Sequence, residues 1–190
     1  MNRILTVFIT VIFMANSTGA KAQQTEGKPQ KILVAYFSWS GNTTRIANVI
    51  RQQTGGDIFE IVPQTQYPKD YDECVDVARK EKNAQARPPL KTKVENMAQY
   101  DMVFVGYPNW WSSIPMPVAT FMESYDFKGK IIIPFCSHGG GGLAQTVKDL
   151  KKLCPYVPFA KPIAIEGNGR SSLSSDIKKW LETIGIVDSR

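Results

Sequence analysis

The sequence predicts an α/β fold in which five parallel strands form one doubly wound sheet with helices on both faces. Short, almost purely apolar runs are typical of strands buried on both faces. Each run is followed by a stretch with helical spacing, so helices are expected to link successive parallel strands. No internal repeat or low-complexity tract interrupts this alternation. Such folds bind ligands beyond the carboxyl ends of their strands, and the loops there are the first candidates for a site.

The chain of 190 residues begins with a pattern typical of secretion. Arg3 precedes an apolar run over residues 4–15, and Ala20-Lys21-Ala22 has the small-x-small form of a cleavage site. The run is shorter than the roughly 20 residues of a membrane span, so no membrane attachment is expected after cleavage. The alternative is an uncleaved N-terminal anchor. The predicted organisation is a signal peptide over 1–22, a flexible leader over 23–30 and one domain over 31–190, in an exported and periplasmic protein.

Charge and cysteine content exclude some partners. The net charge is +6, and removing Arg3 and Lys21 with the signal leaves +4. The basic residues are scattered among acids rather than gathered in a block, which argues against a nucleic-acid partner. Three cysteines without a CxxC pair, beside a single histidine, argue against a zinc site. Cys74, Cys136 and Cys154 are interpreted as buried thiols, with a disulfide as the alternative.

The first half of the domain contains two predicted strands and two predicted helices. The first strand is expected over 31–37, where 32–37 is a continuous apolar run, and the helical pattern after it ends at Gly55-Gly56. A second strand is expected over 57–62. The segment 63–95 is long, polar and interrupted by prolines, and its middle, 70–84, is compatible with a helix.

The second half continues the same alternation. Pro115 and Pro117 suit the first turn of a helix, which is expected to continue through Met122. Four glycines precede the next helical stretch, and the last helix has apolar residues at helical spacing. The predicted strands are 102–106, 130–136 and 161–165, and the predicted later helices are 143–153 and 174–184.

The loop after the first strand has the composition of a phosphate site. Backbone N–H groups at a helix start are unsatisfied, and the helix dipole favours an anion there. No lysine follows as in GxxxxGK[ST], so a phosphate monoester held by neutral donors fits better than a triphosphate. The alternative is an ordinary cluster of helix-capping residues. The loop comprises Ser38, Trp39, Ser40, Gly41, Asn42, Thr43 and Thr44.

The loop after the third strand is aromatic. Tyr107, Trp110 and Trp111 are expected at the mouth of the strand, together with Pro108 and Asn109. Flat rings in such a place suit stacking on a planar ligand. For Trp111, packing under the following helix is the alternative.

The loop after the fourth strand is Ser137-His138 followed by four glycines, which begin with Gly139 and Gly140. Glycines let the backbone approach a ligand closely and present bare N–H groups. His138 is the only histidine of the chain, and it contacts either the ligand or the surrounding structure. Together the three loops favour a ligand with a phosphate at one end and a flat polar ring at the other.

The combined motifs resemble the flavodoxin family. A strand followed by Ser-x-Ser-Gly-Asn-Thr is similar to the flavodoxin phosphate loop. Gly106-Tyr107-Pro108-Asn109-Trp110-Trp111 and Ile114-Pro115-Met116-Pro117 look like the branch with a Tyr-Pro-x-Trp-Trp loop. The resemblance covers about residues 31–186 and implies a sheet order of 2-1-3-4-5.

The resemblance implies that FMN is the cofactor. Ser38, Ser40, Gly41, Asn42 and Thr43 would hold its phosphate. Pro108, Asn109 and Trp110 would border the isoalloxazine, and Ser137, His138 and Gly139 would face the edge of the ring.

We interpret the chain as a redox protein that transfers electrons through the flavin to a partner protein or small acceptor. The flavin supplies the chemistry, and the protein supplies binding and orientation. No acid–base pair or nucleophile set is apparent, so no catalytic residue is assigned. The alternatives are an NAD(P)H-dependent FMN or quinone reductase, and a binding module that has lost flavin while keeping the fold.

Overall fold

The structure is a computed structural model, and it describes residues 30–188. Five parallel strands form a single sheet in the order β2-β1-β3-β4-β5, which confirms the predicted fold class and strand order. The strands are β1 (Ile32–Tyr36), β2 (Asp57–Glu60), β3 (Met102–Pro108), β4 (Ile131–His138) and β5 (Ile163–Glu166).

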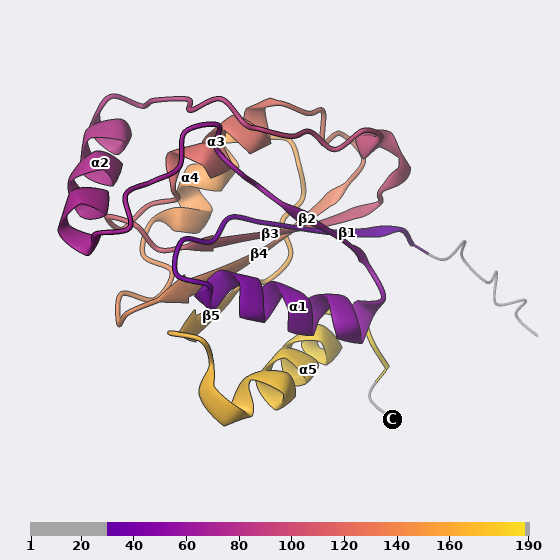
Figure 1. Cartoon of the computed structure of the whole chain (residues 1–190). Helices are drawn as coiled ribbons and strands as arrows, with labels where there is room; N and C mark the ends of the chain where they lie inside the picture. Colours follow the sequence, from indigo (N-terminus) through magenta and orange to yellow (C-terminus); the bar gives the residue numbers. More distant parts are fainter. Residues whose placement is uncertain (1–29, 189–190) are drawn as a thin grey trace, which may run out of the picture.

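Helices cover both faces of this sheet (Figure 1). Helices α1 (Asn42–Thr54) and α5 (Leu173–Thr183) lie on one face, and α3 (Met116–Glu123) and α4 (Thr146–Leu153) lie on the other. Helix α2 (Tyr71–Asn83) stands at the edge of the molecule, beside the carboxyl ends of the strands. Two single-turn 3₁₀ helices, Met97–Gln99 and Arg170–Ser172, precede β3 and α5.

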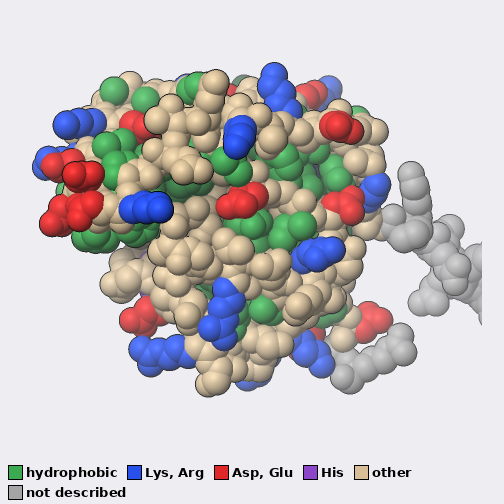
Figure 2. Space-filling model, in the orientation of Figure 1, with side chains coloured by type: hydrophobic (Ala, Val, Ile, Leu, Met, Phe, Trp, Pro, Cys, Tyr) green, Lys and Arg blue, Asp and Glu red, His purple; other side chains and the backbone are tan. Residues whose placement is uncertain are grey.

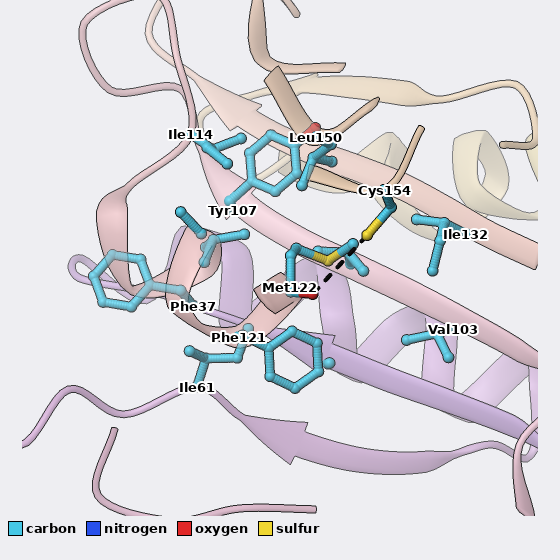
Figure 3. Close-up of a cluster of buried hydrophobic side chains, with 14 of the residues drawn as sticks. Phe37, Ile61, Val103, Tyr107, Ile114, Phe121, Met122, Ile132, Leu150 and Cys154 are labelled. Atoms are coloured by element: carbon cyan, nitrogen blue, oxygen red, sulfur yellow. Dashed lines mark hydrogen bonds between the residues drawn. The ribbon is translucent and has the colours of Figure 1, made fainter. Parts of the chain in front are cut away.

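Alternation along the strands divides the core into two clusters, because successive side chains point to opposite faces. Leu33, Val103 and Ile132 pack with α3 and α4, as Figure 3 shows for the larger side chains of this cluster. Val34, Phe104 and Ile133 pack with α1 and α5. The near-continuous burial of these strands explains why their sequences are apolar without a polar alternation.

Gly106 makes room for a ring between two neighbouring strands. It is paired with Phe135 across β3 and β4. A Cβ atom on Gly106 would lie 2.0 Å from Cζ of Phe135, far inside van der Waals contact. The glycine is therefore required by packing rather than by backbone conformation.

Strands β3 and β4 run two residues further than the sequence predicted. The pairing continues through Tyr107↔Cys136 and Pro108↔Ser137. Tyr107 therefore lies in the core, 0% exposed and beside Ile114 and Leu150 (Figure 3), and not at the mouth of the strand as expected. Helix α4 begins at Thr146 instead of residue 143, because positive φ angles at Gly142 and Ala144 keep that stretch out of helical geometry.

The three cysteines are buried free thiols. Burial raises the pKa of Cys74 to about 11 and that of Cys136 to about 12, so these thiols stay protonated at neutral pH. Within residues 30–188 no helix is long and apolar enough to cross a membrane. Basic and acidic side chains are interspersed over the face seen in Figure 2.

Candidate functional site

The loop between β1 and α1 presents an open helix start. Gly41 occupies the N-cap position with φ +86°, a left-handed conformation that glycine adopts without steric cost. No side chain caps the helix, and its first turn carries no acid. The unsatisfied N–H groups and the positive end of the helix dipole therefore face outward and favour an anion. Ser38 Oγ accepts a hydrogen bond from the N–H of Gly41 at 3.2 Å, which orders the loop itself.

Hydroxyl groups connect this loop to the end of β4. The Oγ atoms of Thr43 and Ser137 lie 2.8 Å apart, and both side chains are buried. Thr44 is half-buried, while Ser40 and Gly41 are exposed. Thr43 thus fixes the helix start against the sheet, and Ser40 is the hydroxyl of the loop most open to a ligand.

Asn109 connects the end of β3 to the loop of four glycines after β4, residues 139–142, which we call the glycine loop. Its backbone N–H donates to the carbonyl of Ser137 at 2.8 Å, and its Nδ2 donates to the carbonyl of Gly142 at 2.8 Å. A Cβ on Gly141 would lie 3.1 Å from that Nδ2, so the close approach of the two loops favours glycine there. The glycine loop is also closed at its start, where Nδ1 of His138 accepts from the N–H of Gly140 at 3.0 Å. His138 is half-buried, whereas Gly139 and Gly140 are exposed.

A cavity of about 270 Å³ opens beside these loops, between α2 and the segment after β3. Trp39 belongs to the loop between β1 and α1 and also lines the cavity. Asn109 lines the cavity and also contacts the glycine loop. Aromatic and aliphatic side chains form most of its lining, which suits a flat ring. The lining comprises Trp39, Tyr71, Cys74, Val75, Ala78, Asn109, Trp110 and Trp111.

The tryptophans also hold α2 in place. Nε1 of Trp39 donates to the carbonyl of Pro68 at 2.8 Å, just before α2, and Nε1 of Trp111 donates to the carbonyl of Val75 at 3.0 Å. Trp110 is half-buried and packs edge-on against Phe37 and Tyr67, with ring centroids 5.3 and 5.0 Å apart. Trp111 is 43% exposed and lies against α2, so it does not pack under the following helix.

Trp111 and Ser112 form a strained turn. Trp110 and Ser113 exchange two backbone hydrogen bonds of 3.0 Å, and the two residues between them have φ angles of +54° and +61°. Tight turns with two positive φ angles favour Asn-Gly, Asp-Gly or Gly-Gly, because glycine has no Cβ and Asn and Asp tolerate the left-handed conformation better than other residues. Two hydrogen bonds from residues outside the turn stabilise it. Lys82 Nζ donates to the carbonyl of Trp111 at 2.6 Å, and the N–H of Gln145 donates to the carbonyl of Ser112 at 3.0 Å.

Ser112→Gly is expected to stabilise the protein. It removes the Cβ at φ +61°, and the relief exceeds the added chain entropy of glycine by about 0.5–1 kcal/mol. Urea denaturation measures the change in the free energy of unfolding. Ser124→Gly is the control, because φ there is −82° and no strain is relieved. A lower stability of Ser112→Gly would refute strain at this turn.

The structure brings the three predicted loops together at one end of the sheet. Their residues differ in how far their side chains are exposed to solvent. Tyr107 is the exception, because its side chain is directed into the core. Sequence reasoning missed the wall contributed by α2, namely Tyr71, Cys74, Val75 and Ala78. The buried pair Cys74 and Ala78 at i,i+4 spacing indicates which face of α2 points inward, although it does not say what that face covers.

The sequence profile of flavodoxins matches residues 31–184, most of the chain. A candidate flavoprotein from Bacteroides eggerthii is 35% identical, with a TM-score of 0.74 over 82% of this chain and 98% of its own. Another from Bacteroides uniformis is 33% identical, with a TM-score of 0.72 over 80% of this chain and 99% of its own. No match was found among curated proteins.

The chain belongs to the flavodoxin family. A flavoprotein from Lactobacillus acidophilus in complex with FMN shares the flavodoxin fold at 20% identity, with a TM-score of 0.63 over 80% of this chain and 98% of its own. Family membership supports FMN as the cofactor of this flavodoxin. The residues present fit that group: an uncapped helix start with neutral donors suits the phosphate, and the adjoining aromatic cavity suits a ring.

Proposed function

We propose that this flavodoxin transfers electrons through bound FMN to a redox partner protein or a small electron acceptor. The open start of α1 carries the proposal, because it offers N–H groups without a capping side chain or an acid in the first turn. Such a site binds a phosphate monoester through neutral donors and the helix dipole. FMN supplies the electron-accepting and electron-donating chemistry when bound.

The residues of the chain then have distinct roles. Ser38, Ser40, Gly41 and Asn42 hold the phosphate, and Thr43 fixes the helix start by its hydrogen bond to Ser137. Asn109, Trp39 and Trp110 line the aromatic cavity beside α2, which we call the ring compartment, and limit the access of water to it. The glycine loop after His138 presents backbone N–H groups to the polar edge of the ring.

Two measurements test this function. A visible absorption spectrum of the purified protein after incubation with FMN reports flavin binding. Anaerobic mixing of the photoreduced protein with a one-electron acceptor, such as cytochrome c, then reports electron transfer. A colourless protein that cannot be reconstituted would refute the proposal and favour a binding module without flavin.

Reaction with nicotinamide cofactors distinguishes the electron carrier from a reductase. We expect NADH and NADPH to leave the flavin absorbance unchanged on the time scale of stopped-flow mixing. Rapid bleaching by either one would instead assign an NAD(P)H-dependent FMN or quinone reductase on the same fold.

Export to the periplasm is part of the proposal. It rests on the apolar run 4–15 and on Ala20-Lys21-Ala22, which lie outside the described residues. N-terminal sequencing of the protein from its native host is expected to begin at about Gln23. A sequence that begins at Met1 would favour the uncleaved anchor.

A further inference from the structure

A second cavity of about 390 Å³ lies next to the Trp110–Ser113 turn. Its lining includes Ser112 and Ser113, whereas the ring compartment is lined by Trp110 and Trp111. Residues of the phosphate loop and the glycines after His138 do not line it. The cavity is therefore a separate place on the molecule, next to the flavin site.

Apolar and cationic side chains both line this cavity. Ile114, Met116 and Leu153 form the apolar part of the lining, which we call the apolar wall, and Lys82, Arg87 and Lys152 contribute the cations. Asp149 is the single acid of the lining. A ligand that complements both kinds of side chain has an apolar body and a negatively charged end.

Two of the three cations are already neutralised. Arg87 donates to both oxygens of Glu123, at 2.7 and 2.8 Å, and to the carbonyls of Gln85 and Ala86. Lys152 Nζ lies 2.8 Å from Asp149 Oδ1, and the other oxygen of Asp149 accepts from Ser113 at 2.7 Å. Burial favours the neutral form of Asp149, but its partners outweigh this and lower its pKa, so the carboxylate stays charged.

Lys82 is the remaining cation. Its ammonium group has three N–H donors, and one of them is used in the 2.6 Å bond to the carbonyl of Trp111. Within residues 30–188 no carboxylate forms an ion pair with Lys82. The side chain is half-buried, so water screens its charge less than that of an exposed lysine. The charge of Lys82 helps to lower the pKa of Asp149, but the two oxygens of that carboxylate already bond Lys152 and Ser113. With Arg87 paired to Glu123 and Lys152 to Asp149, the cavity carries an excess of one positive charge, which belongs to Lys82.

We propose that this cavity binds a small organic acid, with its carboxylate at Lys82 and its apolar body against Ile114, Met116 and Leu153. A single unpaired cation matches a monoanion, and the apolar wall distinguishes an organic carboxylate from an inorganic anion. The neutral side chains of Ser112 and Gln145, which also line the cavity, complete the polar end. The inference does not depend on flavin binding.

The same lysine connects this cavity to the ring compartment. Lys82 donates a hydrogen bond to the carbonyl of Trp111. The indole of Trp111 lines the first cavity and donates to the carbonyl of Val75. The N–H of Gln145 donates to the carbonyl of Ser112, the next residue of the strained turn. A carboxylate at Lys82 is therefore expected to alter the environment of Trp111, which provides a signal for binding.

Benzoate is the probe, and its uncharged isostere benzamide is the comparison. Titration of the purified protein is followed by ¹H–¹⁵N NMR, with and without FMN. We expect benzoate to cause saturable shifts at the amides of Ser112 and Gln145 and at the indole N–H of Trp111. Benzamide is expected to bind at least tenfold more weakly, because it lacks the charge that makes a hydrogen bond to Lys82 strong.

Two lysine variants test the placement. Lys82→Met is expected to weaken benzoate binding at least tenfold. Lys80→Met removes the same charge from an exposed position of α2 and is expected to leave binding unchanged. Equal binding of benzoate and benzamide to the wild-type protein would overturn the proposal whatever the stability of the variants. Three other outcomes would overturn it as well. They are an equal loss of benzoate affinity in the two lysine variants, saturable shifts with inorganic phosphate but not with benzoate, and no saturable shifts with benzoate.

Discussion

Ser40→Asp is expected to weaken FMN binding at least tenfold while leaving riboflavin binding nearly unchanged. Ser40 is exposed and directly precedes the glycine N-cap of α1, so an added carboxylate would stand close to the phosphate. Two unit charges about 4 Å apart interact with about 4 kcal/mol at an effective dielectric of about 20, and solvent reduces this value. A tenfold loss of affinity corresponds to about 1.4 kcal/mol, which is well below the unscreened value and therefore allows for screening by solvent. Riboflavin lacks the phosphate and does not experience the repulsion.

Fluorescence titration of both ligands measures the two affinities. Ser175→Asp is the matched control, because it adds the same charge at an exposed position of α5. Ser40→Ala separates the loss of the hydroxyl from the added charge. Equal losses of FMN and riboflavin in Ser40→Asp would show that this loop does not hold the phosphate.

Gly106→Ala is expected to lower the free energy of unfolding by about 3 kcal/mol, at the upper end of the usual cost of overpacking. The added Cβ would lie 2.0 Å from Cζ of Phe135, and both residues are in the middle of paired strands. Phe135 is 0% exposed, so its ring cannot move into solvent to relieve the contact. Urea denaturation of the flavin-free protein measures the change without a contribution from ligand binding.

Gly139→Ala is the control for this substitution, because a Cβ there would meet nothing within 4 Å. Combining Gly106→Ala with Phe135→Leu shortens the ring side chain that the Cβ would meet. The double variant is therefore expected to lose less stability than the sum of the two single variants. Strict additivity would mean that the clash with Phe135 is not the source of the loss.

Residues 31–37 and 102–106 illustrate how much of the fold was accessible from the sequence. Their apolar runs indicated buried parallel strands, and the pairing of β1 with β2 and β3 confirms this. The ends of β3 and β4 were less accessible. The Tyr107-Pro108 and Ser137-His138 segments have the composition of loops, yet pairing between the two strands keeps them in the sheet.

The candidate site likewise has a part that was predictable from the sequence and a part that was not. The phosphate loop is local, because its hydroxyls, Gly41 and the start of α1 are neighbours in the chain. The sequence alone therefore determined where the phosphate of FMN is expected, and it determined the family. The wall formed by α2 and the contact between Thr43 and Ser137 join segments far apart in the chain, and no local pattern reports them.

The tertiary structure alone decided which side chains face a ligand and which face the core. Tyr107 lies near the end of β3 and Trp110 just after it, yet Tyr107 is buried in the core and Trp110 lines the aromatic cavity. Composition cannot separate them, because the direction of a side chain depends on where the sheet pairing ends. The positive charge of Lys82 beside the Trp111 carbonyl is likewise a product of packing, since α2 and the strained turn meet only in the folded chain.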